Sequence, residues 1–191
     1  LSENGYLIDE GVGKDTLPQN LMIMLSAYPT LISIVYTDNI GPHRKLLPIL
    51  KNKWNSENSL IITFDDDFKD SFSFQHSVAE LVKYYVASDR SSVVALRTRR
   101  IGLCADKYSI SNNTSISVSL YKGWNCCNRP GTKEMLVLPT GVGGVLYKPS
   151  FFHEAIFDMK LRRLTHTNDD ITFRLSTMMK NIEVITAFRV F

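Results

Sequence analysis

The sequence is poor in features that mark several classes of protein. It has only three cysteines in 191 residues, and two of them, Cys126 and Cys127, are adjacent, where an ordinary disulfide would be strained. This argues against a disulfide framework and favours a reducing compartment, which we take to be the cytoplasm. No apolar run is long enough to span a bilayer. The formal net charge of +3 is too small to indicate a nucleic-acid partner.

The motifs of several enzyme classes are also missing. The stretch GVGKD contains the Gly-Lys pair of a phosphate-binding P-loop, but Ile8 and Asp15 stand where that loop requires a glycine and a hydroxyl residue. There is no G-x-S-x-G nucleophile elbow. The four histidines and three cysteines do not have the spacing of zinc ligands. P-loop, elbow-type hydrolase and zinc chemistries are therefore disfavoured.

The chain is rich in short runs of apolar residues. Hydrophobic residues make up 44% of the sequence and charged residues 21%, which is typical of a soluble globular domain with a real core. Seven runs have the length and β-branched composition of strands. These runs are 31–37, 60–64, 92–96, 116–121, 135–138, 144–147 and 182–187.

Apolar residues at helical spacing occur between several of these runs. They predict helices over 17–27, 42–54, 74–86 and 169–179, with Pro48 bending or shortening the second of them. Strands that alternate with helices predict an α/β fold. We expect a single domain over 1–191, with a mixed, mainly parallel central sheet flanked by helices.

Three consecutive acids follow one of the predicted strands. Asp65, Asp66 and Asp67 stand at what would be the carboxyl end of a buried strand, where ligands bind in open α/β sheets. Neighbouring carboxylates repel each other, which raises a pKa or calls for a cation. Because residues i and i+2 of an extended chain face the same way, Asp65 and Asp67 are predicted to converge on Mg²⁺ or Mn²⁺. The alternative is a polar loop that leads into a capped helix.

Two further clusters have both a structural and a functional interpretation. The glycines of LPTGVGGVLY, among them Gly143 and Gly144, let a backbone approach a ligand closely, or they form a plain turn or bulge. In THTNDDITF, Asp169 and Asp170 begin a predicted helix. They are either first-turn acids that favour the helix dipole or a general base and acceptor clamp for group transfer.

Basic residues stand at the start of another predicted helix. In GPHRKLLP, Arg44 and Lys45 follow a strand-like run, a location that favours phosphates. A solvated helix end explains the same pattern equally well.

The order of these motifs resembles that of nucleotide-sugar-dependent glycosyltransferases of the GT-A fold. It runs G-P-x-x-K, strand-D-D-D, T-G-V-G-G-V-L-Y-x-P and N-D-D-I, over roughly residues 34–181. IITFDDD resembles the metal-binding D-x-D motif of that family, TGVGGVLY its glycine loop near donor sugar and acceptor, and NDDI its x-E-D motif. The size is also similar to that of chlorovirus glycosyltransferase domains that build a capsid glycan.

The resemblance implies a nucleotide-binding part at about 1–100 and an acceptor-side part at about 101–191. It implies a UDP-sugar donor, Mn²⁺ or Mg²⁺ as cofactor, and a glycan or glycoprotein acceptor. Further domains of a longer polypeptide are also expected as partners. A viral origin would place the reaction in the cytoplasm of the infected host cell.

By motif match, the resemblance assigns Asp65 and Asp67 to the metal and Asp170 to the base of inverting members. Asp169 stands beside it, where the family usually has glutamate. The remaining residues that the resemblance assigns would lie around the donor: Asp38, Arg44, Lys45, Asp66, Gly143 and Gly144. Among them, Arg44 and Lys45 would lie near the diphosphate and Asp66 at the ribose or sugar. Gly143 and Gly144 would face the acceptor side.

Two other functions stay open at this point. One is another metal–phosphate enzyme such as a nucleotidyltransferase, because carboxylates on a sheet edge serve both chemistries. The other is a non-catalytic module that binds nucleotides or carbohydrates.

Overall fold

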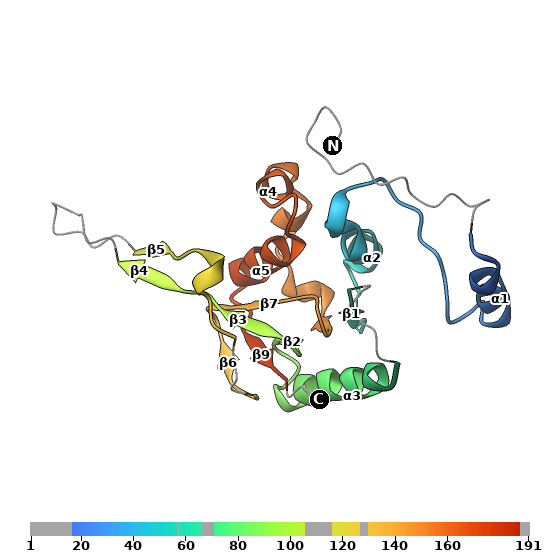
Figure 1. The fold of residues 1–191 in the computed structure, drawn as a ribbon, viewed down its shortest axis with the longest axis horizontal. Coiled ribbons are helices and arrows are strands. Elements are labelled where there is room, and N and C mark those ends of the chain that lie inside the picture. The colour runs from blue at the N-terminus through green and yellow to red at the C-terminus, as the bar shows by residue number, and fades with distance from the viewer. Residues whose placement is uncertain (1–16, 57, 66–70, 106–115, 127–129, 188–191) are drawn as a thin grey trace.

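A five-stranded mixed sheet forms the centre of the fold. The computed structural model describes residues 17–56, 58–65, 71–105, 116–126 and 130–187, and the statements below concern those residues. The strands lie side by side in the order β1 (Ile61–Thr63), β8 (Val145–Tyr147), β2 (Val93–Ala95), β9 (Val184–Thr186) and β6 (Lys133–Glu134). The chain is therefore of the α/β class that the sequence predicts (Figure 1).

The strand directions differ from the prediction. β8 pairs antiparallel with both β1 and β2, β2 pairs parallel with β9, and β6 pairs antiparallel with β9. A mainly parallel sheet is thus wrong for the described strands, in which one of the four pairings is parallel. The central strands β2 and β8 are fully buried. Such strands have apolar residues on both faces, and this pattern carries no sign of strand direction.

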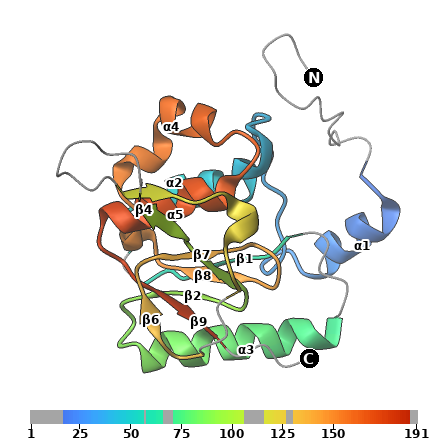
Figure 2. The ribbon, with the colours of Figure 1, turned by 60° about the vertical axis from the view of Figure 1, so that its left-hand side comes forward.

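Helices cover both faces of this sheet. Figure 2 shows α3 (Ser71–Ala87) on one side, and α2 (Leu47–Lys53), α4 (Met159–Leu164) and α5 (Asp169–Met179) on the other. Of the apolar residues at helical spacing in α3, Leu81 and Tyr85 pack into the core, with 0% and 4% exposure. The predicted helices 74–86 and 169–179 are confirmed.

The segment before the sheet departs more strongly from expectation. α1 (Gln19–Ala27) forms as predicted, but it has no buried residue and lies apart from the other helices in both views (Figures 1 and 2). The predicted strand at 31–37 is wrong: this stretch has no regular secondary structure, and Leu31 is 81% exposed. A β-branched run forms a strand only where a neighbouring strand accepts its backbone, and here none pairs with it.

The predicted helix at 42–54 is divided in two. It becomes the 3-10 helix η2 (Gly41–Lys45) followed by α2, with Pro48 in the first turn of α2. A proline is tolerated there because its missing N–H would have no intrahelical partner. The other 3-10 helices described are η3 (Tyr121–Gly123), η4 (Pro149–Phe151) and η5 (Glu154–Phe157).

Two small two-stranded sheets extend from the central one. β3 (Thr98–Arg100) pairs with β7 (Val137–Pro139), and β4 (Leu103–Ala105) pairs with β5 (Ile116–Val118), both antiparallel. β3, β4 and β6 are not predicted, because each is only two or three residues long. Within the part of the chain that the structure describes, no helix has the length and apolarity needed to cross a membrane.

Candidate functional site

The site forms at one edge of the central sheet. Because β1 and β8 are antiparallel, the carboxyl end of β1 meets the amino end of β8, and Thr63 is paired with Val145 there. Asp65 follows β1, and the glycine-rich turn from Gly141 precedes β8. A Cβ atom on Gly141 would lie 2.5 Å from both carboxylate oxygens of Asp65, so any larger residue there would force the Asp65 carboxylate to move.

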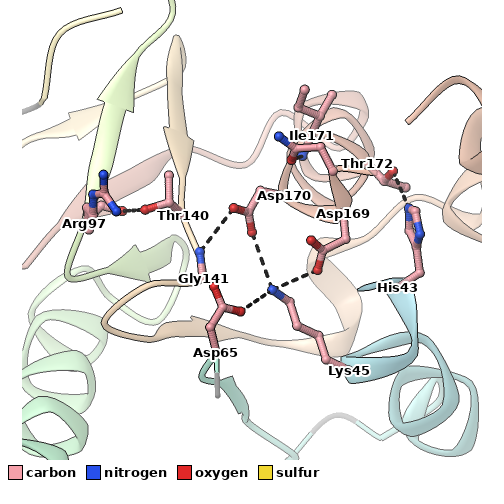
Figure 3. A network of polar contacts seen from close by, with 11 residues as sticks. His43, Lys45, Asp65, Arg97, Thr140, Gly141, Asp169, Asp170, Ile171 and Thr172 are labelled. Carbon is pink, nitrogen blue, oxygen red and sulfur yellow. Dashed lines mark hydrogen bonds and ion pairs between the residues drawn. The ribbon is translucent and has the colours of Figure 1, made fainter. Parts of the chain in front are cut away.

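Three carboxylates converge on the ammonium group of Lys45 (Figure 3). Lys45 Nζ donates a hydrogen bond to Asp65 Oδ1 at 2.7 Å. It forms ion pairs with Asp169 Oδ2 at 2.9 Å and with Asp170 Oδ1 at 3.8 Å. The four side chains are between 9% and 28% exposed. The structure thus brings together four of the residues singled out in the sequence.

Local structure holds these side chains in place. Lys45 is the last residue of η2, and Asp169 and Asp170 form the first turn of α5. Asn168 caps this helix, its Oδ1 accepting from the N–H of Ile171 at 3.2 Å. The two interpretations of the acids in NDDI are therefore compatible, because they occupy the first turn of a capped helix and also face Lys45.

A buried histidine attaches η2 to α5. His43 is 1% exposed, and its Nε2 lies 2.9 Å from Thr172 Oγ1 (Figure 3). Burial lowers the pKa of His43, although the charge of Asp169 acts in the opposite direction. The contact fixes the element that carries Lys45 against the helix that carries its acidic partners.

Asp170 has an altered acidity. Burial, with Asp169 as the next contribution, raises the pKa of Asp170 to about 6, while Lys45 and the N–H of Gly141 oppose the shift. That N–H donates to Asp170 Oδ2 at 3.2 Å. A carboxyl group with a pKa near neutrality can accept and release a proton under ordinary conditions, which is the property of a general base.

The cluster has more negative than positive charge. With all groups ionised, one ammonium and three carboxylates give 1 − 3 = −2. Burial would lower the pKa of Lys45, but Asp169, Asp65 and Asp170 outweigh it and raise that pKa above its usual value. Asp169 Oδ2 and Asp170 Oδ1 are buried, and the Lys45 ammonium faces them at 2.9 and 3.8 Å. This arrangement favours additional positive charge.

The other predicted site residues lie elsewhere or outside the described part. Asp38 lines a separate open cavity of about 730 Å³ together with Lys51 and Trp54. Arg44 is exposed on η2. Asp66 and Asp67 fall outside the described residues, so their predicted roles at the ribose or sugar and at the metal stay predictions.

Gly143 and Gly144 shape the turn before β8. Both have positive φ values, +98° and +107°, which glycine adopts without strain. A Cβ atom on Gly144 would lie 2.5 Å from the ring of Phe64, so the space beside it is filled by the residue that precedes Asp65. Gly144 therefore lets the turn pack onto the end of β1, while Gly143 faces Leu96, which follows β2.

Gly141 is the residue whose role the sequence does not reveal. Its N–H binds Asp170 and its missing side chain makes room for Asp65, so it links the two halves of the cluster. The only signal in the sequence is its membership of the glycine-rich turn.

Comparison with protein-family models, with curated proteins and with solved structures finds no match for this chain.

Proposed function

We propose that this chain is a metal-dependent glycosyltransferase of the GT-A type, which transfers a sugar from a nucleotide-diphosphate sugar to an acceptor hydroxyl. The observation that carries the proposal is the cluster of Lys45, Asp65, Asp169 and Asp170 at the carboxyl end of β1. Ligands of α/β sheets bind at this edge. The choice of a UDP-sugar, the GT-A assignment and a glycan of viral origin as product rest on the sequence resemblance.

The carboxylates suit a divalent metal ion. Mg²⁺ and Mn²⁺ prefer hard oxygen ligands, and Mg²⁺ in phosphate-transferring sites is held by one or two carboxylates together with substrate phosphates. Among the described residues, no group of three or more histidine, cysteine, aspartate or glutamate side chains is placed to hold a metal ion. Asp65 is partly exposed at the rim and would hold such an ion jointly with the donor. When bound, the metal supplies positive charge that offsets the diphosphate leaving group.

The residues of the chain have distinct tasks in this reaction. The acceptor oxygen forms a bond to the anomeric carbon of the sugar, while the bond from that carbon to the diphosphate breaks and its electron pair leaves with the diphosphate. Lys45 stabilises the charge that develops on the leaving group. In an inverting reaction, the acceptor proton moves to the carboxylate of Asp170, whose pKa of about 6 suits a base near neutral pH.

A reducing compartment is compatible with the structure. Cys104 and Cys126 are both free and exposed. We propose that the reaction takes place in the cytoplasm.

The proposal is tested by incubating the chain with UDP-, GDP- and dTDP-sugars, with Mn²⁺ or after removal of divalent metal with EDTA. We expect metal-dependent release of a nucleoside diphosphate from at least one donor, and its loss in Asp170→Asn. Release of pyrophosphate from a nucleoside triphosphate would instead identify a nucleotidyltransferase. Binding of a nucleotide sugar without release under any condition would identify a binding module.

A further inference from the structure

An apolar groove lies on the side of α5 that faces β7 and the β4–β5 sheet. Its volume is about 570 Å³, within the range of about 300–1,000 Å³ that is usual for small-molecule pockets. The aromatic rings of Tyr121 and Trp124 and the aliphatic side chains of Leu138, Ile171 and Leu175 form much of its lining. Leu175 is 41% exposed, so the groove presents apolar surface to solvent.

Several polar groups of the groove are engaged within the protein, and the lining also contains the hydroxyl of Tyr121. Trp124 Nε1 donates to the carbonyl of Ser119 at 2.9 Å. The guanidinium of Arg174 donates to Thr177 Oγ1 and to the carbonyl of Ile182. Asn168 Oδ1 caps α5. Apart from the Tyr121 hydroxyl, the groove therefore offers mainly ring faces and aliphatic groups, and a ligand made mainly of hydroxyl groups would lose most of its hydration without compensation.

The groove and the acid cluster are built on two shared chain segments, although the four cluster residues are not part of the groove lining. Ile171 in its lining directly follows Asp170 in α5. Leu138, also in the lining, lies in β7, which ends shortly before Gly141 in the sequence. The N–H of Gly141 donates to Asp170. The groove and the Asp170 carboxylate therefore depend on the same two segments, and Figure 3 shows Ile171 and Gly141 on either side of Asp170.

We infer that the groove binds the acceptor, and that the acceptor is an amphiphile whose reactive hydroxyl is attached to an apolar body. This inference rests on the proposed function and refines it, because the sequence resemblance implies only a glycan or glycoprotein acceptor. The apolar body packs between the aromatic residues and α5, and the hydroxyl points toward Asp170. Burial of the apolar body, rather than hydrogen bonding, supplies the affinity.

Binding is tested without donor or turnover, using two glucosides with the same polar head. The chain has two tryptophans, so Trp54→Phe leaves Trp124 as the only tryptophan reporter in the groove. Octyl β-D-glucopyranoside, kept below its critical micelle concentration, is expected to change Trp124 emission saturably. Methyl β-D-glucopyranoside is expected to bind at least about tenfold more weakly, because it lacks the apolar chain.

Two matched variants locate the site. Leu175→Glu places a charge in the groove wall and is expected to weaken octyl glucoside binding by at least about tenfold. Met179→Glu is the control: Met179 is on the same helix and 54% exposed, but it is not part of the groove lining. The control is expected to bind like the parent protein. Equal loss in both variants, with both folded by circular dichroism, would overturn the inference.

Turnover separates this inference from the proposed function. If a nucleotide sugar is hydrolysed but octyl glucoside neither binds nor accelerates release of the nucleoside diphosphate, the apolar acceptor is wrong and the transferase proposal stands. If octyl glucoside binds at Trp124 but no nucleotide sugar is used, the acceptor role is overturned together with the proposed function. A dimer in sedimentation that Leu175→Glu converts to a monomer would identify the groove as an interface between copies, and would also overturn the inference.

Discussion

Two cationic side chains at helix α5 have different surroundings: Lys45 contacts the first turn of the helix, and Arg174 is part of the helix. Lys45 lies among three carboxylates at the first turn, whereas Arg174 in the middle of the helix is 2% exposed and donates to neutral groups. Arg174 binds Thr177 Oγ1 at 2.9 Å, the carbonyl of Ile182 at 2.8 Å and the carbonyl of Met135. It therefore connects α5 to the segments that lead into β9 and β7.

The two environments act on acidity in opposite directions. Burial lowers the pKa of Arg174 to about 10, with Tyr147 and Glu183 opposing it. The carboxylates around Lys45 raise its pKa despite burial. Arg174 satisfies buried carbonyls and so supports the fold, whereas Lys45 holds mutually repelling acids together at a sheet edge, as the proposed site requires.

The largest expected effect is a loss of folding stability in the variant Arg174→Leu. Loss of three charge-assisted hydrogen bonds at about 1.5 kcal/mol each should lower the free energy of unfolding by about 4.5 kcal/mol. Denaturant titration measures this, with the exposed Arg163→Leu as control. Donor binding by the folded fraction should stay close to that of the parent protein, because Arg174 lies in the groove lining and not in the acid cluster. A stable variant that no longer binds the donor would reverse the roles assigned to the two cations.

Lys45→Met should show the opposite behaviour. Removing the cation that stabilises the leaving group should lower the rate of nucleoside diphosphate release by roughly 100-fold. The fold should persist, because Asp170 can take up a proton and relieve the repulsion among the acids. Lys53→Met, on the exposed end of α2, is the control. Unfolding of Lys45→Met at neutral pH would show that the ion pairs are structural.

The pH dependence of turnover should report Asp170. Since the base must be deprotonated, the rate should fall about tenfold per pH unit below pH 6 and level off above it.

The free energy of unfolding should change with pH in the opposite direction to the rate. The folded state retains the Asp170 proton between about pH 4 and pH 6 while the unfolded state does not, so stability rises as pH falls through this window. Asp170→Asn should remove this contribution to stability and also abolish turnover.

The smallest expected effect is that of Gly141→Ala. The added Cβ atom would lie 2.5 Å from the carboxylate of Asp65 and force it away from Lys45. We expect roughly a fivefold loss of turnover, with a modest change in melting temperature, because the shift concerns one partly exposed side chain. Gly123→Ala, whose Cβ atom would meet only Ser119 Oγ at 4.0 Å, should behave like the parent protein. If both alanine variants have the same activity, Gly141 does not position Asp65.

Much of the local structure follows from the sequence. The buried runs predict β1, β2, β8 and β9, and Asn168 followed by two acids predicts the start of α5. These features depend on neighbouring residues alone. The strand directions do not, because a fully buried run has the same pattern in either direction.

The site itself is less predictable. The sequence singles out Lys45, Asp65, Asp169 and Asp170 separately, but nothing local indicates that the ammonium of Lys45 binds all three acids. The two contacts of Gly141 also depend on how β8 lies against β1. Such contacts between distant segments are set by the tertiary fold.

The most direct test of the account is a crystal structure of the chain with UDP-glucose and Mn²⁺. The account predicts density for the diphosphate within about 3 Å of the Lys45 ammonium, with the metal on Asp65 and the sugar facing Asp170. Density for the nucleotide sugar away from this cluster, with the ion pairs of Lys45 unchanged, would contradict it.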